Sequence, residues 1–207
     1  VEIPVATQIF VHTKGQQNIF AIIAAVLDKL QLNIQDARLH TTSDNRAFDV
    51  FYVLDENDRP IGNDSKLCSL VVETLRTGIV DPDSVSFDIS RRTPRQLKNF
   101  TLKTVASLRN DAETNSTVIE VITPDRPGLL AHLATIFLRY DLNLYNAKIS
   151  TLGERVEDTF YVTDQQHRPL NDQQLSQEIQ NIICSELDSR NQQDVIDVEM
   201  PKAKVWH

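Results

Sequence analysis

The feature that most constrains this chain is an internal repeat. Aligning Thr123 on Thr13 gives an offset of 110 residues, at which every apolar position of one helical stripe is matched. The two stripes are Ile19, Phe20, Ile23, Val26, Leu27 and Leu30, and Leu129, Leu130, Leu133, Ile136, Phe137 and Tyr140. After a deletion of one residue, residues 158–169 match residues 49–60. Chance would not sustain this match through several elements, so the chain contains one structural unit twice.

Hydrophobic periodicity predicts the order strand, helix, strand, strand, helix, strand in each unit. In the first unit we expect strands at residues 5–11, 32–41, 47–54 and 84–89, and helices at residues 19–30 and 64–78. Asp64 or Ser65 can cap the second helix and Gly78 can close it. The second unit is expected to end with a helix over residues 175–187 and a strand at residues 195–198. The predicted fold class is therefore α+β, with two ferredoxin-like βαββαβ units whose antiparallel sheets pair side by side.

The repeat also predicts how the chain divides. We expect a first domain at residues 1–90, a connector at 91–116, a second domain at 117–200 and a tail at 201–207. Residues 91–99 are basic and favour a solvated linker, with a contact to an acidic partner as the alternative. Residues 102–108 form a possible extra strand. They can instead be the fourth strand of the first unit in place of residues 84–89, and the sequence leaves both arrangements open.

The turn at residues 123–130 joins a strand to a helix in the second unit. Pro127 suits the first helical turn, Asp125 can cap the free amides, and Gly128 lets another group approach the backbone. The start of a helix suits a carboxylate, and Asp125 can hold an ammonium group. These are the two poles of a free amino acid. The alternative is that the turn only shapes and caps the helix.

Asn33 and Asn143 occupy equivalent places just after the first helix of each unit. If the units pair side by side, the turn at residues 125–130 faces Asn33 and the turn at residues 14–18 faces Asn143. An Asn amide offers donors and an acceptor to a polar ligand. Alternatively, each Asn only stabilises the exit from a helix.

Composition narrows the classes of partner. The chain carries 21 Lys and Arg against 29 Asp and Glu, a net charge of −8, which argues against binding to nucleic acid or to an anionic membrane. No apolar run approaches the roughly 20 residues that span a bilayer. Cys68 and Cys184 stand alone and are expected to be reduced thiols of a cytosolic protein. Because the chain opens on Val1 and its one methionine is Met200, we expect a piece of a longer protein.

Residues for catalysis are sparse. The histidines are scattered, without the spacing of a metal site, and they are His12, His40, His132, His167 and His207. Neither a Gly-x-Ser-x-Gly motif nor a glycine-rich phosphate loop is present. Asp49 and Asp158 repeat at strand positions, as do Asp55 and Asp164, and both pairs are interpreted as structural. We therefore expect no catalytic site in this chain.

Three segments carry a resemblance to a known family. They are residues 94–100, residues 149–164 and the motif Asp125, Arg126, Pro127, Gly128, Leu129 and Leu130. Together they resemble tandem ACT domains, specifically the carboxy-terminal regulatory region of bacterial PII uridylyltransferase/uridylyl-removing enzymes. The likeness extends over nearly the whole chain.

The resemblance implies a glutamine-sensing module in which that motif, with Asn33 and Asn143, binds glutamine. It also implies a cytoplasmic parent enzyme. There, a nucleotidyltransferase domain that uses UTP and Mg²⁺ attaches UMP to the PII signalling protein, and a His-Asp hydrolase domain removes it. The ACT sheets allow a homo-oligomer. In the first repeat, residues 14–18 replace the Asp-Arg-Pro-Gly turn, so it stays open whether this repeat binds ligand through its own turn.

Two other functions remain to be weighed. One is an interaction module that binds no amino acid and docks PII or the catalytic domains of the parent. The other is an independent small enzyme, which the missing catalytic groups disfavour.

Overall fold

The structure is a computed structural model that describes residues 6–14, 18–42, 46–85, 102–152 and 155–190. The first repeat contains β1 (Thr7–Lys14), α1 (Ile19–Lys29), β2 (Asn33–Thr41), β3 (Arg46–Leu54), α2 (Ser65–Val80) and the 3-10 turn η1 (Pro82–Ser84). The second part contains β4 (Val105–Asp111), β5 (Ser116–Pro124), α3 (Leu129–Arg139), β6 (Asn143–Lys148), β7 (Thr151–Leu152), β8 (Arg155–Thr163) and α4 (Gln173–Arg190).

One antiparallel sheet runs through both repeats. Its strand order is β1-β3-β2-β6-β8-β5-β4, with the short β7 paired to β8. The repeats meet where β2 pairs with β6, and there Ala37 lies opposite Ala147 with both side chains fully buried. The predicted α+β fold of two ferredoxin-like units, joined side by side, is confirmed.

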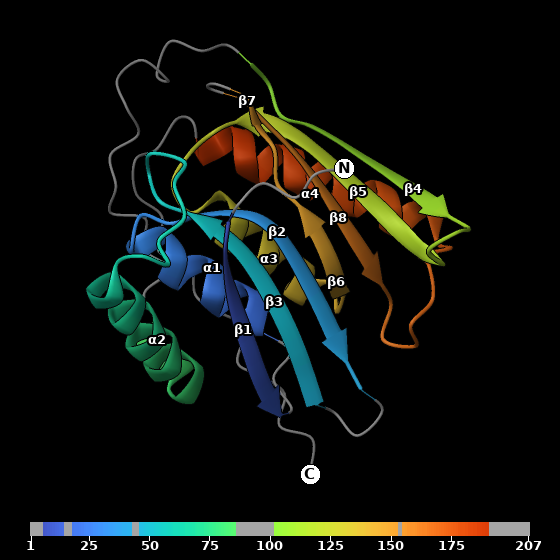
Figure 1. The fold of residues 1–207 in the computed structure, drawn as a ribbon. Coiled ribbons are helices and arrows are strands. Elements are labelled where there is room, and N and C mark those ends of the chain that lie inside the picture. The colour runs from blue at the N-terminus through green and yellow to red at the C-terminus, as the bar shows by residue number, and fades with distance from the viewer. Residues whose placement is uncertain (1–5, 15–17, 43–45, 86–101, 153–154, 191–207) are drawn as a thin grey trace.

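The helices pack on one face of this sheet, with α1, α3 and α4 behind it in the view of Figure 1. At the centre α1 and α3 contact each other, while α2 packs against α1 and α4 against α3. Residues 19–27 of α1 are buried on every side, as expected of a helix enclosed by a sheet and two helices. The two repeats therefore share one core. None of the described helices is long and apolar enough to cross a bilayer.

β4 resolves one of the open alternatives. It pairs with β5 in register from Val105 opposite Ile122 to Asp111 opposite Ser116, so it extends the second repeat and is not the fourth strand of the first. The loop between β4 and β5 is short, so closing it costs little conformational entropy. Asn115 in this loop adopts the positive φ of 50° that the turn needs. The expected strands at residues 84–89 and 195–198 fall largely or wholly outside the described residues. The predicted domain boundaries stay predictions.

The ends of α2 confirm one expectation and correct another. Asp64 caps the helix by accepting hydrogen bonds from the backbone amides of Lys66 and Leu67, each at 3.0 Å. Gly78 does not close α2, which continues to Val80. A Cβ at Gly78 would lie 2.7 Å from Cγ2 of Val85, so the glycine permits close packing inside the helix.

Candidate functional site

Two cavities lie between the repeats and are related by the internal symmetry. Each has a volume of about 500 Å³. We name them by the buried aspartate in the wall of each, the Asp158 cavity and the Asp49 cavity. Each is formed by the start of the first helix of one repeat and the beginning of the second strand of the other. For the Asp158 cavity these are the start of α3 and β2, and for the Asp49 cavity the start of α1 and β6.

Most of the residues predicted to bind ligand line the Asp158 cavity. They are Asp125, Arg126, Gly128, Leu129, Leu130 and, from the other repeat, Asn33. Asn143 lines the Asp49 cavity with Ile19 and Phe20 from the start of α1. Pro127 lies in the same turn but does not line either cavity. The structure thus brings the turn of the second repeat and the Asn of the first repeat together around one space.

The turn differs in detail from the prediction. Helix α3 begins at Leu129, and its N-cap is Gly128 in the left-handed region with a φ of 72°. Pro127 therefore precedes the cap and does not occupy the first helical turn, and Asp125 is not the cap. A glycine reaches this φ without strain, and that displaces the start of the helix. Because glycine has no side chain, the N-cap makes no side-chain hydrogen bond to the amides of α3.

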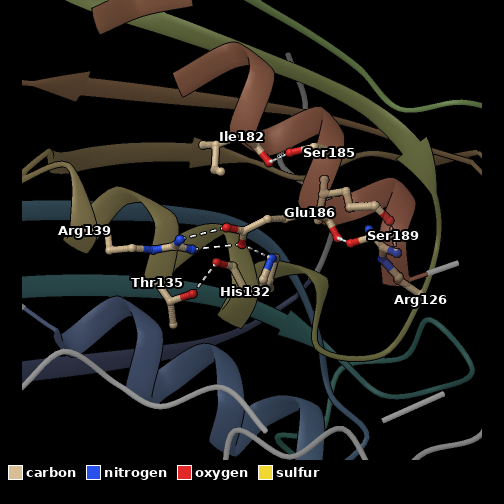
Figure 2. Close-up of polar contacts among 9 residues, drawn as sticks. Arg126, His132, Thr135, Arg139, Ile182, Ser185, Glu186 and Ser189 are labelled. Carbon is tan, nitrogen blue, oxygen red and sulfur yellow. Dashed lines mark hydrogen bonds and ion pairs between the residues drawn. The ribbon is translucent and has the colours of Figure 1, made fainter. Parts of the chain in front are cut away.

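Arg126 connects the turn to α4. Its Nη1 donates a hydrogen bond of 2.6 Å to the carbonyl oxygen of Leu187, and Figure 2 shows the side chain beside the last turns of that helix. Carbonyl groups at the end of a helix lack partners within it, so an arginine stabilises them. One side chain of the turn thereby holds the end of α4.

A second contact joins α3 to α4 one turn further on (Figure 2). Glu186 accepts hydrogen bonds from Nη1 and Nη2 of Arg139 at 2.7 and 2.9 Å. It also lies 2.9 Å from Nε2 of the buried His132. Burial alone would raise the pKa of Glu186, but the hydrogen bond and charge of Arg139 and the nearby His132 lower it. Helix α3, which starts at the Asp158 cavity, is therefore linked to α4 by the ion pair between Arg139 and Glu186.

The two asparagines are partly occupied by the fold. Nδ2 of Asn143 donates to the carbonyl oxygen of Asp164 at 2.8 Å, whereas Nδ2 of Asn33 lies 3.5 Å from the equivalent carbonyl of Asp55. The Asn143 amide is also approached by Nε2 of Gln165 at 3.4 Å. Asn143 thus has the stronger structural role, and Asn33 keeps more of its hydrogen-bonding capacity for a ligand.

The repeated aspartates divide into two kinds. Oδ1 of Asp164 accepts hydrogen bonds from the amides of Gln166 and Arg168, and Oδ1 of Asp55 makes the equivalent bonds. These two aspartates shape turns, which agrees with their interpretation as structural residues. Asp49 and Asp158 are different, because each side chain is only 1% exposed and lines a cavity.

Residues 117–180 match the family model of the ACT domain. These residues are an ACT domain.

Most of the chain is similar to bifunctional uridylyltransferase/uridylyl-removing enzymes. The enzyme of Stutzerimonas stutzeri is 44% identical over 191 residues, which cover 90% of this chain and 21% of that enzyme. The enzyme of Pseudomonas syringae pv. syringae is 45% identical over 181 residues, covering 87% of this chain and 20% of that enzyme. The chain thus spans about a fifth of the length of these relatives. The resemblance predicted from the sequence is confirmed.

Among solved structures, a crystal structure of aspartate kinase from Synechocystis aligns with a TM-score of 0.44 at 17% identity. The alignment covers 92% of this chain and 28% of that chain.

Asp158 is a carboxylate of this cavity that the sequence alone did not assign to a site. Burial raises the pKa of Asp158 to about 7, against a hydrogen bond from the Ser150 amide, and the neighbouring Asp125 raises it further. Burial also raises the pKa of Asp125, and the negative charge of Asp28 raises it further. The hydrogen bond that Asp125 accepts from the Arg126 backbone acts in the opposite direction. The carboxylates repel one another, so the cavity favours a positively charged group.

One signal in the sequence marks Asp158. Val156, Phe160 and Val162 share its face of β8 and are buried, so an acidic residue interrupts an apolar alternation. Such an interruption in a buried face indicates a polar function or a polar partner. The repetition of the same residue at Asp49 led to the structural interpretation instead.

Proposed function

We propose that this chain is the regulatory region of a bifunctional uridylyltransferase/uridylyl-removing enzyme and that it senses glutamine in the Asp158 cavity. The observation that carries the proposal is the meeting of an uncapped helix start with several carboxylates in one cavity between the repeats. The amides of α3 suit the ligand carboxylate, and Asp125 suits its ammonium group. Asn33, exposed at the start of β2 and lining the same cavity, suits the side-chain amide of the ligand.

In this proposal the catalytic work belongs to the parent enzyme, which is cytoplasmic and modifies PII with UMP from UTP in the presence of Mg²⁺. Because both repeats contribute walls to the cavity, glutamine makes a different set of contacts if the repeats shift against each other. A ligand changes a conformational equilibrium only through such a difference in contacts. The cavity at the joint between the repeats is therefore a suitable place for an allosteric signal.

Calorimetry of this chain with glutamine tests the proposal, with glutamate and asparagine as controls. Asp125→Ala is expected to weaken glutamine binding by about 1–3 kcal/mol, because it removes the partner of a charged group. Asp83→Ala is the matched control, since Asp83 is an exposed acid in η1 outside both cavities. Unchanged glutamine affinity in Asp125→Ala, with the same circular dichroism spectrum, would dismiss the assignment.

A second candidate function is an interaction module that docks PII or the catalytic domains. The observation in its favour is an aromatic group on the face of the sheet away from the helices. Phe10 is 64% exposed and Phe48 is 36% exposed, and the ring of His12 stacks on Phe48 at 4.6 Å between centroids. Loss of PII modification in the parent on Phe10→Ser, together with unchanged glutamine affinity, would favour this function.

A further inference from the structure

The wall of the Asp158 cavity contains a carboxylate oxygen that the fold does not use. Oδ1 of Asp158 accepts a hydrogen bond of 3.3 Å from the backbone amide of Ser150. Oδ2 is fully buried and accepts no hydrogen bond from any residue that the structure describes. A buried carboxylate destabilises the folded state unless its oxygens accept hydrogen bonds. An apolar side chain like those of Val156 and Phe160 on the same face of β8 would stabilise the fold more.

The groups around Asp158 define what it can bind. Its cavity is lined by further acids from three neighbouring segments, which are Asp125 in the turn, Asp28 in α1, and Glu56 and Asp58 after β3. Among the described residues of this wall, Arg126 is the one basic side chain, and its Nη1 is engaged with α4. The described carboxylates are not grouped as metal ligands. A compact organic cation with several N–H donors fits these acceptors.

We propose that Asp158 accepts the α-ammonium group of the amino acid and is the residue that selects ligands carrying that group. This inference rests on the proposed function, because it names the innermost contact of the same site. Asp125, which is half-buried, then holds the ammonium group from the side of the turn. The carboxylate of the ligand stays at the start of α3. The ammonium group supplies the hydrogen bonds that Oδ2 of Asp158 lacks.

Binding then moves a proton. Burial raises the pKa of Asp158 to about 7, so near pH 6 the side chain is mostly protonated. A cationic ligand binds the ionised form, and the proton leaves to solvent. Affinity is therefore expected to rise with pH and to level off above the pKa. Glutamine should bind about tenfold more weakly at pH 6 than at pH 8.

The test compares two ligands and two matched variants by calorimetry. The ligands are glutamine and 4-carbamoylbutanoate, which is glutamine without its amino group, and the variants are Asp158→Asn and Asp49→Asn. The wild-type chain is expected to prefer glutamine about 10- to 100-fold. It should also release close to one proton at pH 6, measured in buffers of different ionisation enthalpy. In Asp158→Asn the preference should fall to a few-fold and the proton release should disappear. Asp49→Asn should retain both.

Full preference and full proton release in Asp158→Asn would overturn the assignment while leaving the glutamine site intact. A wild-type chain that binds no glutamine would overturn the proposed function itself, and this inference with it. Because Asn replaces a buried charge by a neutral group of the same shape, Asp158→Asn is expected to fold. Its unfolding curve is recorded alongside the titrations.

Discussion

The two repeats share their apolar framework but differ in the contact between their helices. The buried positions that align are Val71 and Leu75 of α2 with Ile179 and Ile183 of α4. At this register Gly78 of α2 corresponds to Glu186 of α4. Gly78 packs closely on α1, where a Cβ would come within 3.4 Å of Cγ2 of Ile22. In the second repeat, Glu186 instead binds Arg139 and lies beside His132.

The two cavities differ in a parallel way. Both contain a buried aspartate. Burial raises the pKa of Asp49 to about 6, although a hydrogen bond from the backbone amide of His40 acts to lower it. The surrounding charges are not shared, however. Three acids of the Asp158 cavity, Asp28, Glu56 and Asp58, are replaced in the Asp49 cavity by Leu138, Gln165 and His167.

The apolar pattern determines the fold in both repeats, while the polar substitutions distinguish the second repeat from the first. The second repeat combines the turn, an acidic cavity and a polar connection to α4. Arg126 and Arg139 join the turn and the helix at this cavity to α4, through Leu187 and Glu186. The first repeat has an apolar contact in the equivalent place.

The largest expected effect comes from moving the charge of the second repeat into the first. Gly78→Glu places a Cβ 2.7 Å from Cγ2 of Val85 and 3.4 Å from the side chains of Ile22 and Val26. In this repeat the residues aligned with the partners of Glu186 are Ile22 in place of His132 and the exposed Lys29 in place of Arg139. The free energy of unfolding should fall by about 3–5 kcal/mol, because the new side chain overpacks the contact with α1 and its carboxylate lacks the buried histidine beside Glu186. Urea denaturation measures it. Gly62→Glu is the control, because Gly62 is exposed and should cost less than about 0.5 kcal/mol. Equal losses in the two variants would show that the contacts are not distinct.

Neutralising the buried aspartates should stabilise both repeats, and the second one more. Folding raises the pKa of Asp158 to about 7 and that of Asp49 to about 6 from 3.8. The folded state therefore favours the protonated forms, and stability falls as the pH rises from about 4 toward these values. At pH 8, Asp158→Asn should add about 2–4 kcal/mol and Asp49→Asn about 1–3 kcal/mol to the free energy of unfolding. At pH 4 neither should change it. A gain that persists at pH 4 would refute the electrostatic origin.

The contact between α3 and α4 should contribute less, because Glu186 is 24% exposed. Glu186→Gln is expected to lower the free energy of unfolding by about 1–2 kcal/mol at pH 7. The pKa of Glu186 is lowered in the folded state, so this stabilisation is present above the ordinary glutamate pKa and is lost as the pH falls. Glu178→Gln, which makes the acceptor of the exposed Tyr140 hydroxyl neutral, is the control. Identical acid denaturation of wild type and Glu186→Gln would contradict this role.

Much of the fold could be predicted because its signals are local. The helical stripe starting at Ile19 predicted α1 at residues 19–30, against Ile19–Lys29 in the structure. The repeat then predicted the continuous sheet. The partner of β4 could not be predicted, because strand pairing is non-local and two positions were compatible with its pattern. Gly78 was misassigned because the sequence does not show how closely α1 approaches α2.

The candidate site was predicted only in part, for a related reason. The motif around Gly128 marks the turn from residue types alone, and the symmetry of the repeats predicted that Asn33 would face it. The sequence indicated Asp125 as the cap of α3, but the helix begins one residue after Gly128, whose left-handed backbone makes it the N-cap. The role of Asp158 depends on its burial beside a cavity and on the neighbouring Asp125, which only the tertiary structure reveals.

The smallest expected effect separates the two asparagines. Asn33→Ala should weaken glutamine binding about 3- to 10-fold, the loss of one neutral hydrogen bond, with little change in stability, because its bond to the Asp55 carbonyl is long at 3.5 Å. Asn143→Ala should show the reverse. It removes a 2.8 Å bond to the Asp164 carbonyl and should cost about 0.5–1.5 kcal/mol of stability while leaving glutamine affinity within about twofold. Calorimetry measures the glutamine affinity of both variants, and urea denaturation measures their stability.

In the parent enzyme, Asn33→Ala should raise the glutamine concentration at which uridylylation gives way to removal of the uridylyl group. Both rates measured without glutamine should stay nearly unchanged, since allosteric coupling acts through ligand contacts. If Asn143→Ala shifted that concentration as much as Asn33→Ala, both cavities would bind glutamine and the repeats would be functionally equivalent.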